Sequence, residues 1–237
     1  RECDAAKETC SAVYHECRLG IIVAAIFVLL SQLTVMSLAG YVYPNVYGSA
    51  AAQSTASLLG TVVMLIVCAP FASKLAAKFG KKELAVASSI CSALVWLVCL
   101  IWRPASVWGF VACYILANIG MGFFNTIIWA MITDVIDDAE VRSGIREDGT
   151  IYSVYSFARK LGQAFSSGLV GALLGIIGYT EATAFDPAVT RGIFNMACIA
   201  PIIGFVCIVL ALVFLYPLNK KKVEENVAAL AARRNSK

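Results

Sequence analysis

Six long apolar stretches constrain this chain more than any other feature of its sequence. They cover residues 19–43, 51–75, 84–102, 107–133, 151–179 and 193–218. A helix needs roughly 20 apolar residues to cross the hydrocarbon core of a bilayer, and every stretch reaches or closely approaches that length. None shows the alternation of apolar and polar residues that a membrane β-barrel requires. The sequence therefore predicts an all-α membrane protein in which residues 19–218 form six transmembrane helices.

The composition agrees with this prediction and argues against several functions. Only 14% of the residues are charged, whereas soluble domains contain about 25%. Membrane topology accounts for the positions of Lys and Arg, so we expect no nucleic-acid partner. The sequence patterns HExxH and GxSxG, which mark zinc proteases and serine hydrolases, do not occur. We therefore expect neither an enzyme nor a bound cofactor.

The cysteines do not predict disulfide bonds. Six of the nine lie inside apolar stretches, where a free thiol behaves as a small hydrophobic group. The other three, Cys3, Cys10 and Cys17, recur every seven residues near His15. This pattern allows a metal site on one helix face, but no CxxC or HxxxH spacing accompanies it. We favour a chance pattern and expect no metal site within this chain.

Lys and Arg are unevenly distributed among the connecting segments. Residues 74–82 contain four Lys and residues 220–222 contain three, whereas residues 44–50 contain no Lys or Arg. The other two segments on the same side as 44–50 contain one each, Arg103 and Arg191. Because positive residues concentrate in cytoplasmic loops, we expect a multi-pass protein of the cell membrane with both termini in the cytoplasm. Residues 1–18 are then a cytoplasmic linker and residues 219–237 a cytoplasmic tail.

The densest cluster of charge lies between the fourth and fifth stretches, in TDVIDDAEVRSGIREDGT (residues 133–150). Acids at the C-terminal end of a helix are unfavourable by a few tenths to about 1 kcal/mol each, because the helix dipole is negative there. We therefore expect cations from other helices close by. Two interpretations are open: a solvated turn with balanced charges, and an ion-pair lock that closes the cytoplasmic side of a transport path. We favour the lock. Its candidate residues are Asp134, Asp137, Glu140, Arg142 and Arg146.

A polar stripe runs along the fifth stretch. Its members recur at steps of three and four residues: Tyr152, Tyr155, Ser156, Arg159, Lys160, Gln163 and Ser167. Lys160 lies roughly 14 Å from the start of the stretch, close to the middle of the hydrocarbon core. A charge at that depth is costly and usually marks a pathway or a binding site. The alternatives are snorkelling of the two cations to the interface and ordinary helix packing of the Tyr and Ser residues.

The two cations of the stripe have no acidic partner at their depth in this chain. The six stretches contain no Asp or Glu, and buried charges need compensation. This absence, together with a chain that opens at Arg1 in a charged segment, favours a second half that carries membrane-embedded carboxylates.

The segment WAMITDVIDDAEVRSGIREDGTIYSVYSFARKLGQA (residues 129–164) resembles a known family. It is similar to the signature between spans 10 and 11 of the glycoside–pentoside–hexuronide:cation symporters, the melibiose-carrier family within the major facilitator superfamily. The matching residues are Trp129, Asp134, Asp137, Glu140, Gly144, Arg146, Gly149, Tyr152, Ser153, Phe157, Lys160, Gly162 and Ala164. Three positions depart from the family pattern: Asp138 replaces a Tyr, Thr133 replaces an Ala, and Asn125 stands where the melibiose carrier has an aromatic residue near its sugar.

The resemblance implies that this chain is the C-terminal half of a twelve-helix major facilitator fold. Such carriers move a sugar or glycoside together with Na⁺, H⁺ or Li⁺ by alternating access. Lys160 then lies beside the cation and sugar sites, with its acidic partners in the N-terminal half, and the charged segment is the cytoplasmic gate. The implied partners are the sugar, the lipid bilayer, and the N-terminal six-helix half. The candidate substrate- and cation-coupling residues are Lys160, Arg159, Tyr152, Tyr155, Ser156, Gln163, Asn125 and Trp129.

A different class of function is also compatible with the sequence. The chain could be a self-associating six-helix membrane protein that acts as a small carrier or an assembly subunit. Gly171 and Gly175 form a GxxxG pair, which supports close contact between membrane helices. The same pair is also compatible with packing inside the bundle.

Overall fold

The computed structural model describes residues 2–146 and 148–235, and most of them are helical. The helices are α1 (Glu2–Tyr41), α2 (Ala50–Val63), α3 (Ala69–Phe79), α4 (Lys81–Trp102), α5 (Val107–Ser143), α6 (Asp148–Ile177), α7 (Pro187–Leu215) and α8 (Lys220–Asn235). A π-helical turn, Val42–Val46, extends α1, and a second one, Met64–Cys68, joins α2 to α3.

Six helical segments within the described residues are long and apolar enough to cross a membrane. They are Ile21–Val46, Ala50–Phe79, Lys81–Trp102, Val107–Ser143, Asp148–Ile177 and Pro187–Leu215. These segments coincide with the six apolar stretches, so the predicted all-α membrane fold is confirmed. The π-helical turns lengthen two of the segments without dividing them.

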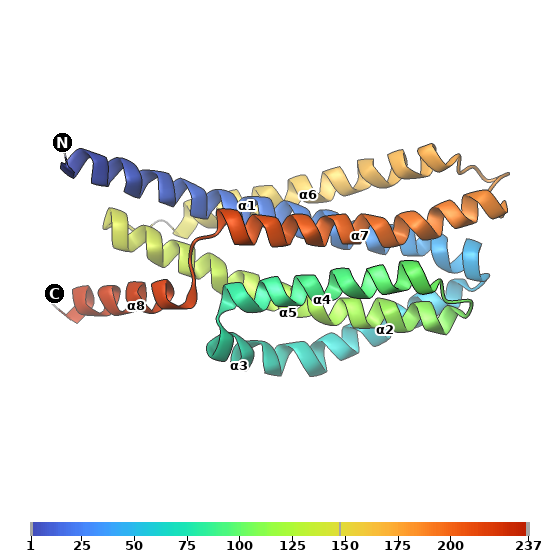
Figure 1. Cartoon of the computed structure of the whole chain (residues 1–237), viewed down its shortest axis with the longest axis horizontal. Coiled ribbons are helices and arrows are strands. Elements are labelled where there is room, and N and C mark those ends of the chain that lie inside the picture. The colour runs from blue at the N-terminus through green and yellow to red at the C-terminus, as the bar shows by residue number, and fades with distance from the viewer. Residues whose placement is uncertain (1, 147, 236–237) are drawn as a thin grey trace.

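The six segments run back and forth along one long axis, so alternate connections meet at the same end of the bundle (Figure 1). One end holds the start of α1, the α3–α4 junction at Gly80, the turn at Gly144 and the connection from α7 to α8. We call it the charged end. Gly80 and Gly144 have φ angles of +105° and +76°, which glycine adopts at little cost, and they end α3 and α5.

Helix α5 is longer than its apolar stretch. It continues to Ser143, although the apolar residues end near 133. Asp134 and Asp138 are buried on this extension and have cationic partners, so their charge does not end the helix. Gly144 then supplies the positive φ that terminates it. The charged segment is therefore mostly helix rather than turn.

The core lies between α1, α4, α5 and α7. Helix α1 packs against α6 and α7, whereas α4 packs against α5 and α7. Phe110 illustrates the packing, since its ring lies 5.4 Å from that of Tyr43, 6.0 Å from Trp96 and 5.9 Å from Phe194, measured between centroids. Such edge and tilted arrangements are favourable for aromatic pairs. This cluster joins all four helices near the end opposite the charged one.

The two flanking segments are much less buried. Only 22% of the most apolar window is buried in the α2–α3 segment and in α6, compared with 50% in α5 and 44% in α1. Most of the surface of α6 is therefore not covered by this chain. Because the polar stripe lies on α6, its environment depends on what else contacts that surface.

Candidate functional site

The polar stripe lies beside the face of α6 that packs against α1. That packing face contains Ala158, Gly162 and Ser166. A Cβ on Gly162 would lie 2.8 Å from the carbonyl oxygen of Ile26, so the two helices approach closely at this point. The neighbouring residues Ser156, Lys160 and Gln163 are exposed and point away from the contact. Helix α6 is therefore packed against α1 on one side, and most side chains of the polar stripe are not covered by this chain.

Part of the stripe forms an aromatic cluster with a residue of α5. The Trp129 ring lies 5.3 Å from the Tyr155 ring in an edge arrangement and 6.5 Å from the Tyr152 ring in a stacked one. Arg159 places its guanidinium carbon 5.6 Å from the Trp129 centroid and 5.8 Å from the Tyr155 centroid. Cation–π contacts at these distances are attractive and become stronger away from water. We call Trp129, Tyr152, Tyr155 and Arg159 the aromatic–arginine cluster.

Lys160 has a different environment from Arg159. Its side chain is exposed, and no hydrogen bond or ion pair reaches it from the side chains that the structure describes. It lies near the middle of α6, twelve residues after Asp148, or about 18 Å along the helix axis. An ammonium at this depth needs a polar partner or water. Among the residues whose side chains the structure describes, 21–146 and 148–234, no carboxylate pairs with it.

Asn125 faces α1 rather than the aromatic–arginine cluster. Its amide nitrogen lies 3.4 Å from the amide oxygen of Gln32, and both side chains are partly buried. The sequence prediction included Asn125 but missed Gln32. A single amide in the otherwise apolar stretch 19–43 is the signal that would have identified it, because an amide inside a membrane helix needs a partner.

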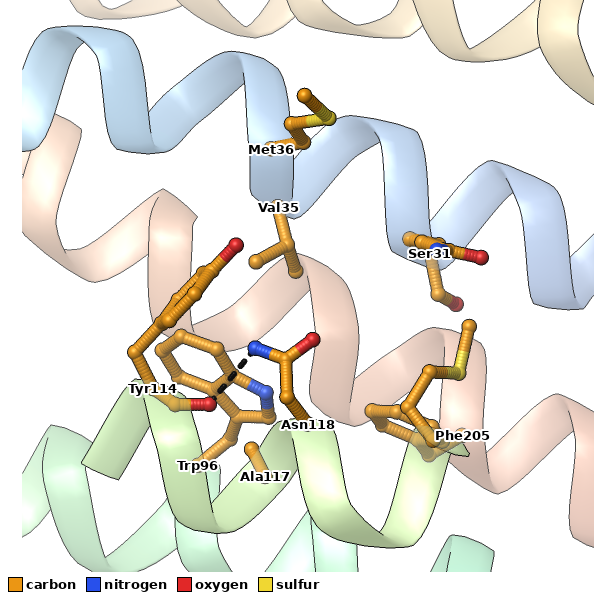
Figure 2. Close-up of a pocket in the computed structure, with 10 residues that line it drawn as sticks. Ser31, Val35, Met36, Trp96, Tyr114, Ala117, Asn118 and Phe205 are labelled. Carbon is orange, nitrogen blue, oxygen red and sulfur yellow. Dashed lines mark hydrogen bonds between the residues drawn. The ribbon is translucent and has the colours of Figure 1, made fainter. Parts of the chain in front are cut away.

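A small cavity opens next to this amide pair (Figure 2). Its volume is about 60 Å³, which is room for a few water molecules at most. Figure 2 shows the Asn118 amide near its centre, donating to the backbone oxygen of Tyr114 at 2.8 Å, with Ser31 and Val35 of α1 across from it. The Ser31 hydroxyl is buried and has no hydrogen-bond partner in the described structure. Polar and apolar side chains both line this recess, and it is too small to enclose a sugar ring.

At the charged end, each acid of the predicted gate has a cationic partner. Lys81 Nζ lies 2.6 Å from Asp134 Oδ1, and Arg142 Nε lies 2.8 Å from Asp138 Oδ2. Lys81 comes from the start of α4, so this pair joins two helices, as predicted for an acid near the end of α5. Asp134 and Asp138 are only 5% and 1% exposed. Ion pairs this deeply buried depend on both partners, because a single charge left behind is poorly solvated.

Arg146 forms ion pairs with the more exposed acids. Its guanidinium lies 3.1 Å from Asp137, 2.9 Å from Glu140 and 2.8 Å from Asp148. The side chains of Asp137 and Glu140 are each 20% exposed and that of Arg146 is 39% exposed. These carboxylates, Asp148 first, raise the pKa of Arg146 above its usual value. Arg146 therefore links the end of α5 to the start of α6.

Helix α8 covers the end of α5. Asn226, which is buried, donates to Asp138 at 2.8 Å. Arg233 donates to the backbone oxygens of Glu140 and Val141 at 3.2 and 2.9 Å, which satisfies carbonyls at the C-terminal end of α5. At the other end of α8, Lys220 donates to the backbone oxygens of Ala77 and Lys78 in α3. The tail is thus a helix packed against the bundle, and the sequence prediction missed these contacts.

The comparison with known proteins decides the family. Residues 14–220 match a family model described as MFS/sugar transport protein. The chain belongs to this family. The predicted resemblance to the glycoside–pentoside–hexuronide branch of the major facilitator superfamily is confirmed.

Three relatives illustrate the relationship. The chain is 27% identical to the glucuronide carrier protein homolog of Escherichia coli (strain K12) over 90% of this chain and 46% of the relative. It is 34% identical to the uncharacterized symporter YjmB of Bacillus subtilis (strain 168) over 64% of this chain and 33% of the relative. It is 30% identical to the uncharacterized symporter YnaJ of the same organism over 74% and 38%. The chain thus spans less than half the length of these relatives, whose names describe transporters.

Proposed function

We propose that this chain forms the C-terminal six helices of a secondary carrier that moves a sugar or glycoside together with Na⁺ or H⁺ by alternating access. The family and the transporter names of its relatives support transport rather than catalysis. The observation that supports coupling is Lys160, an exposed ammonium near mid-helix that pairs with no carboxylate among the side chains the structure describes. We place its acidic partners, and most of the cation site, in an N-terminal six-helix half.

The coupling residues have separate roles in this proposal. Lys160 responds to the occupancy of the cation site, while Trp129 and Tyr152, which are 47% and 38% exposed, offer aromatic surface to a sugar ring. Ser156 and Gln163 lie on the same exposed side and supply hydrogen-bonding groups to the path. Asn125 and Gln32 line the path from α5 and α1. The direct test is uptake of radiolabelled sugars by the full-length carrier, with Na⁺ and pH varied.

The charged residues at this end of the bundle, which include the predicted gate residues and Asp138, divide into two groups by exposure. Asp134 and Asp138 are buried and paired within this half, so we assign them to holding the charged end together. Asp137, Glu140 and Arg146 are partly exposed, and we propose that they contact the other half when the cytoplasmic side closes.

Charge reversal at Arg146 should therefore reduce uptake while the protein remains in the membrane. Arg146→Glu places an acid among three carboxylates, which converts attraction into repulsion at the proposed closing surface. The measurement is initial uptake rate, normalised to carrier in the membrane by immunoblot. Lys222→Glu is the matched control, because Lys222 is exposed and pairs with Glu225 of its own helix, α8. Native uptake by Arg146→Glu would favour a solvated turn over a gate.

The proposed orientation places the charged end in the cytoplasm. Single cysteines at Ala105 and Glu181, both exposed at the opposite end, should react with an impermeant thiol reagent in intact cells. A cysteine at Lys78, exposed near the charged end, should react only after permeabilisation. The background for all three variants is a carrier whose native cysteines are replaced. Labelling at position 78 in intact cells would reverse the orientation.

A further inference from the structure

The connecting segments at the end of the bundle opposite the charged one contain two basic residues, Arg103 and Arg191. Positive residues are scarce in the loops on one side of a membrane, and these two are the exceptions on this side. We propose that they bind the phosphate of an anionic phospholipid in the leaflet at this end. The inference goes beyond the proposed transport function, because it needs only that the chain spans a membrane.

The fold brings the two arginines to one cavity, although they are far apart in the sequence. Arg103 follows α4 in the connection to α5, and Arg191 lies near the start of α7 (Figure 1). Both line a cavity of about 290 Å³, which we call the two-arginine pocket. Its other lining residues include Tyr47, Pro104, Thr190 and Phe194. A volume near the lower end of the range for small-ligand sites accommodates a headgroup phosphate.

The backbone and the side chain of Arg103 are both held in place. Its φ angle of +47° is the one positive value at a non-glycine residue in the described part of the chain. Such a conformation is uncommon for a residue with a side chain, and it persists only where surrounding contacts impose it. The Tyr47 hydroxyl donates to the backbone oxygen of Pro104 at 2.9 Å. The Arg103 guanidinium donates to Asn195 Oδ1, also at 2.9 Å.

The contact with Asn195 holds Arg103 against the part of α7 that carries Arg191. Asn195 lies four residues after Arg191, so their side chains lie on the same face of α7, one turn apart. A guanidinium stays protonated in proteins, so both charges of the two-arginine pocket are permanent. Like charges held on one face repel each other, and an anion that binds both removes that cost.

Carboxylates of this chain do not supply that anion in the structure. Glu181 and Asp186 lie in the connection that leads into α7, but neither lines the cavity. Among the described residues, no ion pair joins either acid to an arginine of the pocket. At the charged end, by contrast, the buried acids are paired with cations of the same chain. The two-arginine pocket therefore presents positive charge to an external anion.

Exposed tryptophans place the two-arginine pocket at the membrane surface. Trp102 and Trp108 flank the connection between α4 and α5 and are 62% and 59% exposed. Tryptophan is enriched at the interface between hydrocarbon and water, at the level of the lipid headgroups. Arg103 directly follows Trp102 at the end of a membrane-spanning helix, so its guanidinium lies at the depth of the phosphates. The planar fork of donors of an arginine matches a phosphate.

The apolar part of the lining favours a lipid over a soluble phosphate. Val46, Pro104 and Phe194 line the pocket beside the arginines. A phospholipid places its glycerol and upper acyl chains against these apolar side chains, whereas a free phosphate leaves them in water. A zwitterionic headgroup brings its own cation towards two arginines. We therefore expect an anionic headgroup to be preferred, as in other basic pockets between membrane helices.

Photo-crosslinking in vesicles tests this inference on the full-length carrier. The carrier is reconstituted in phosphatidylcholine vesicles that contain a trace of photoactivatable phosphatidylglycerol or, in parallel, photoactivatable phosphatidylcholine. Mass spectrometry quantifies labelling of the peptides that contain residues 42–47, 103–108 and 187–194. We expect the phosphatidylglycerol probe to label them about tenfold or more above the phosphatidylcholine probe, since a charge-assisted hydrogen bond contributes about that factor.

Two competitors distinguish the possible sources of the phosphate. Unlabelled dioleoylphosphatidylglycerol in excess should remove the labelling, whereas sn-glycerol 3-phosphate and inorganic phosphate should not. Removal by the soluble phosphates at the same concentration would mean that the pocket binds a soluble phosphate, and the assignment to a lipid would be wrong.

Variants assign the preference to the two arginines. Arg103→Gln and Arg191→Gln should each reduce labelling by the phosphatidylglycerol probe by about tenfold and leave labelling by the phosphatidylcholine probe unchanged. Arg191→Lys keeps the charge but not the fork of donors, and should retain part of the preference. The control is Lys221→Gln, which removes an exposed cation at the charged end. Elution as a single species in size-exclusion chromatography verifies that each variant is folded.

Two further results would overturn the inference. One is equal labelling of the pocket peptides by the two probes in the unmodified carrier, a comparison that requires no variant to fold. The other is an undiminished preference for phosphatidylglycerol when both arginines are replaced by Gln. Sugar uptake is not a readout in any arm, so failure of the proposed transport function leaves these outcomes unchanged.

Discussion

Lys160→Ala in the full-length carrier should abolish uphill accumulation of sugar while downhill exchange continues. In the proposed mechanism, a cation that occupies the acids of the other half weakens their attraction for Lys160. The ammonium is then free to help order the polar stripe around the sugar. Cation and sugar are thereby linked thermodynamically, and typical couplings are about 1–3 kcal/mol, or roughly 5- to 150-fold in affinity. Removal of the ammonium removes the link.

The measurement for Lys160 is sugar affinity with and without the cation, together with the steady-state accumulation ratio. Lys221→Ala is the matched control, because Lys221 is an exposed lysine of α8 outside the membrane-spanning segments. A Lys160→Ala carrier that keeps the native enhancement by cation and still concentrates sugar would show that another residue couples the two.

The second large effect concerns stability at the charged end. Lys81→Met should destabilise the carrier by about 3–5 kcal/mol, because it leaves the buried Asp134 without its partner. The reverse change, Asp134→Leu, should cost less, since the Lys81 side chain is 33% exposed and can be solvated. The double variant should recover much of the loss, as replacing both members of a buried pair is often neutral.

Thermal unfolding of the purified carrier measures this double-mutant cycle, and the coupling energy is read from the four proteins. Lys78→Met is the control, as Lys78 is an exposed lysine near the end of α3, three residues before Lys81. Equal and small effects of both single variants would show that the 2.6 Å contact adds little to stability.

Much of this architecture could be predicted from the sequence, because a helix that crosses a bilayer needs a minimum length and an apolar composition, and both can be read from the sequence alone. All six segments were predicted, with differences only at their ends. The acids beyond residue 133 were predicted to lie at the C-terminal end of a helix, but how far it continues was left open, because their buried partners are not visible in the sequence. The expected cation from another helix is present at Asp134, which pairs with Lys81 of α4, whereas Asp138 pairs with Arg142 of its own helix.

The candidate site was predicted less completely, because spacing along one helix does not reveal contacts between helices. Tyr152, Tyr155, Arg159 and Trp129 were all singled out, yet their union in one cluster depends on how α5 and α6 approach each other. Gln32 lies in a stretch where nothing local marks its partner Asn125. The GxxxG pair is a further example. A Cβ on Gly171 or Gly175 would meet nothing within 4 Å, so the packing of this bundle does not require either glycine.

The position of α8 has a consequence for how a carrier of this kind can move. Lys220 and Arg233 sit at opposite ends of α8, and each places a cation on the last carbonyls of a different helix, α3 and α5. Cations are favoured at helix C-termini, so both attachments are electrostatically matched. Because α8 is hydrogen-bonded to both helices, α3 and α5 cannot slide past each other without breaking the contacts of Lys220 or Arg233. For the proposed carrier, we therefore expect α3 and α5 to move together, as they would in a rocking motion of the whole bundle.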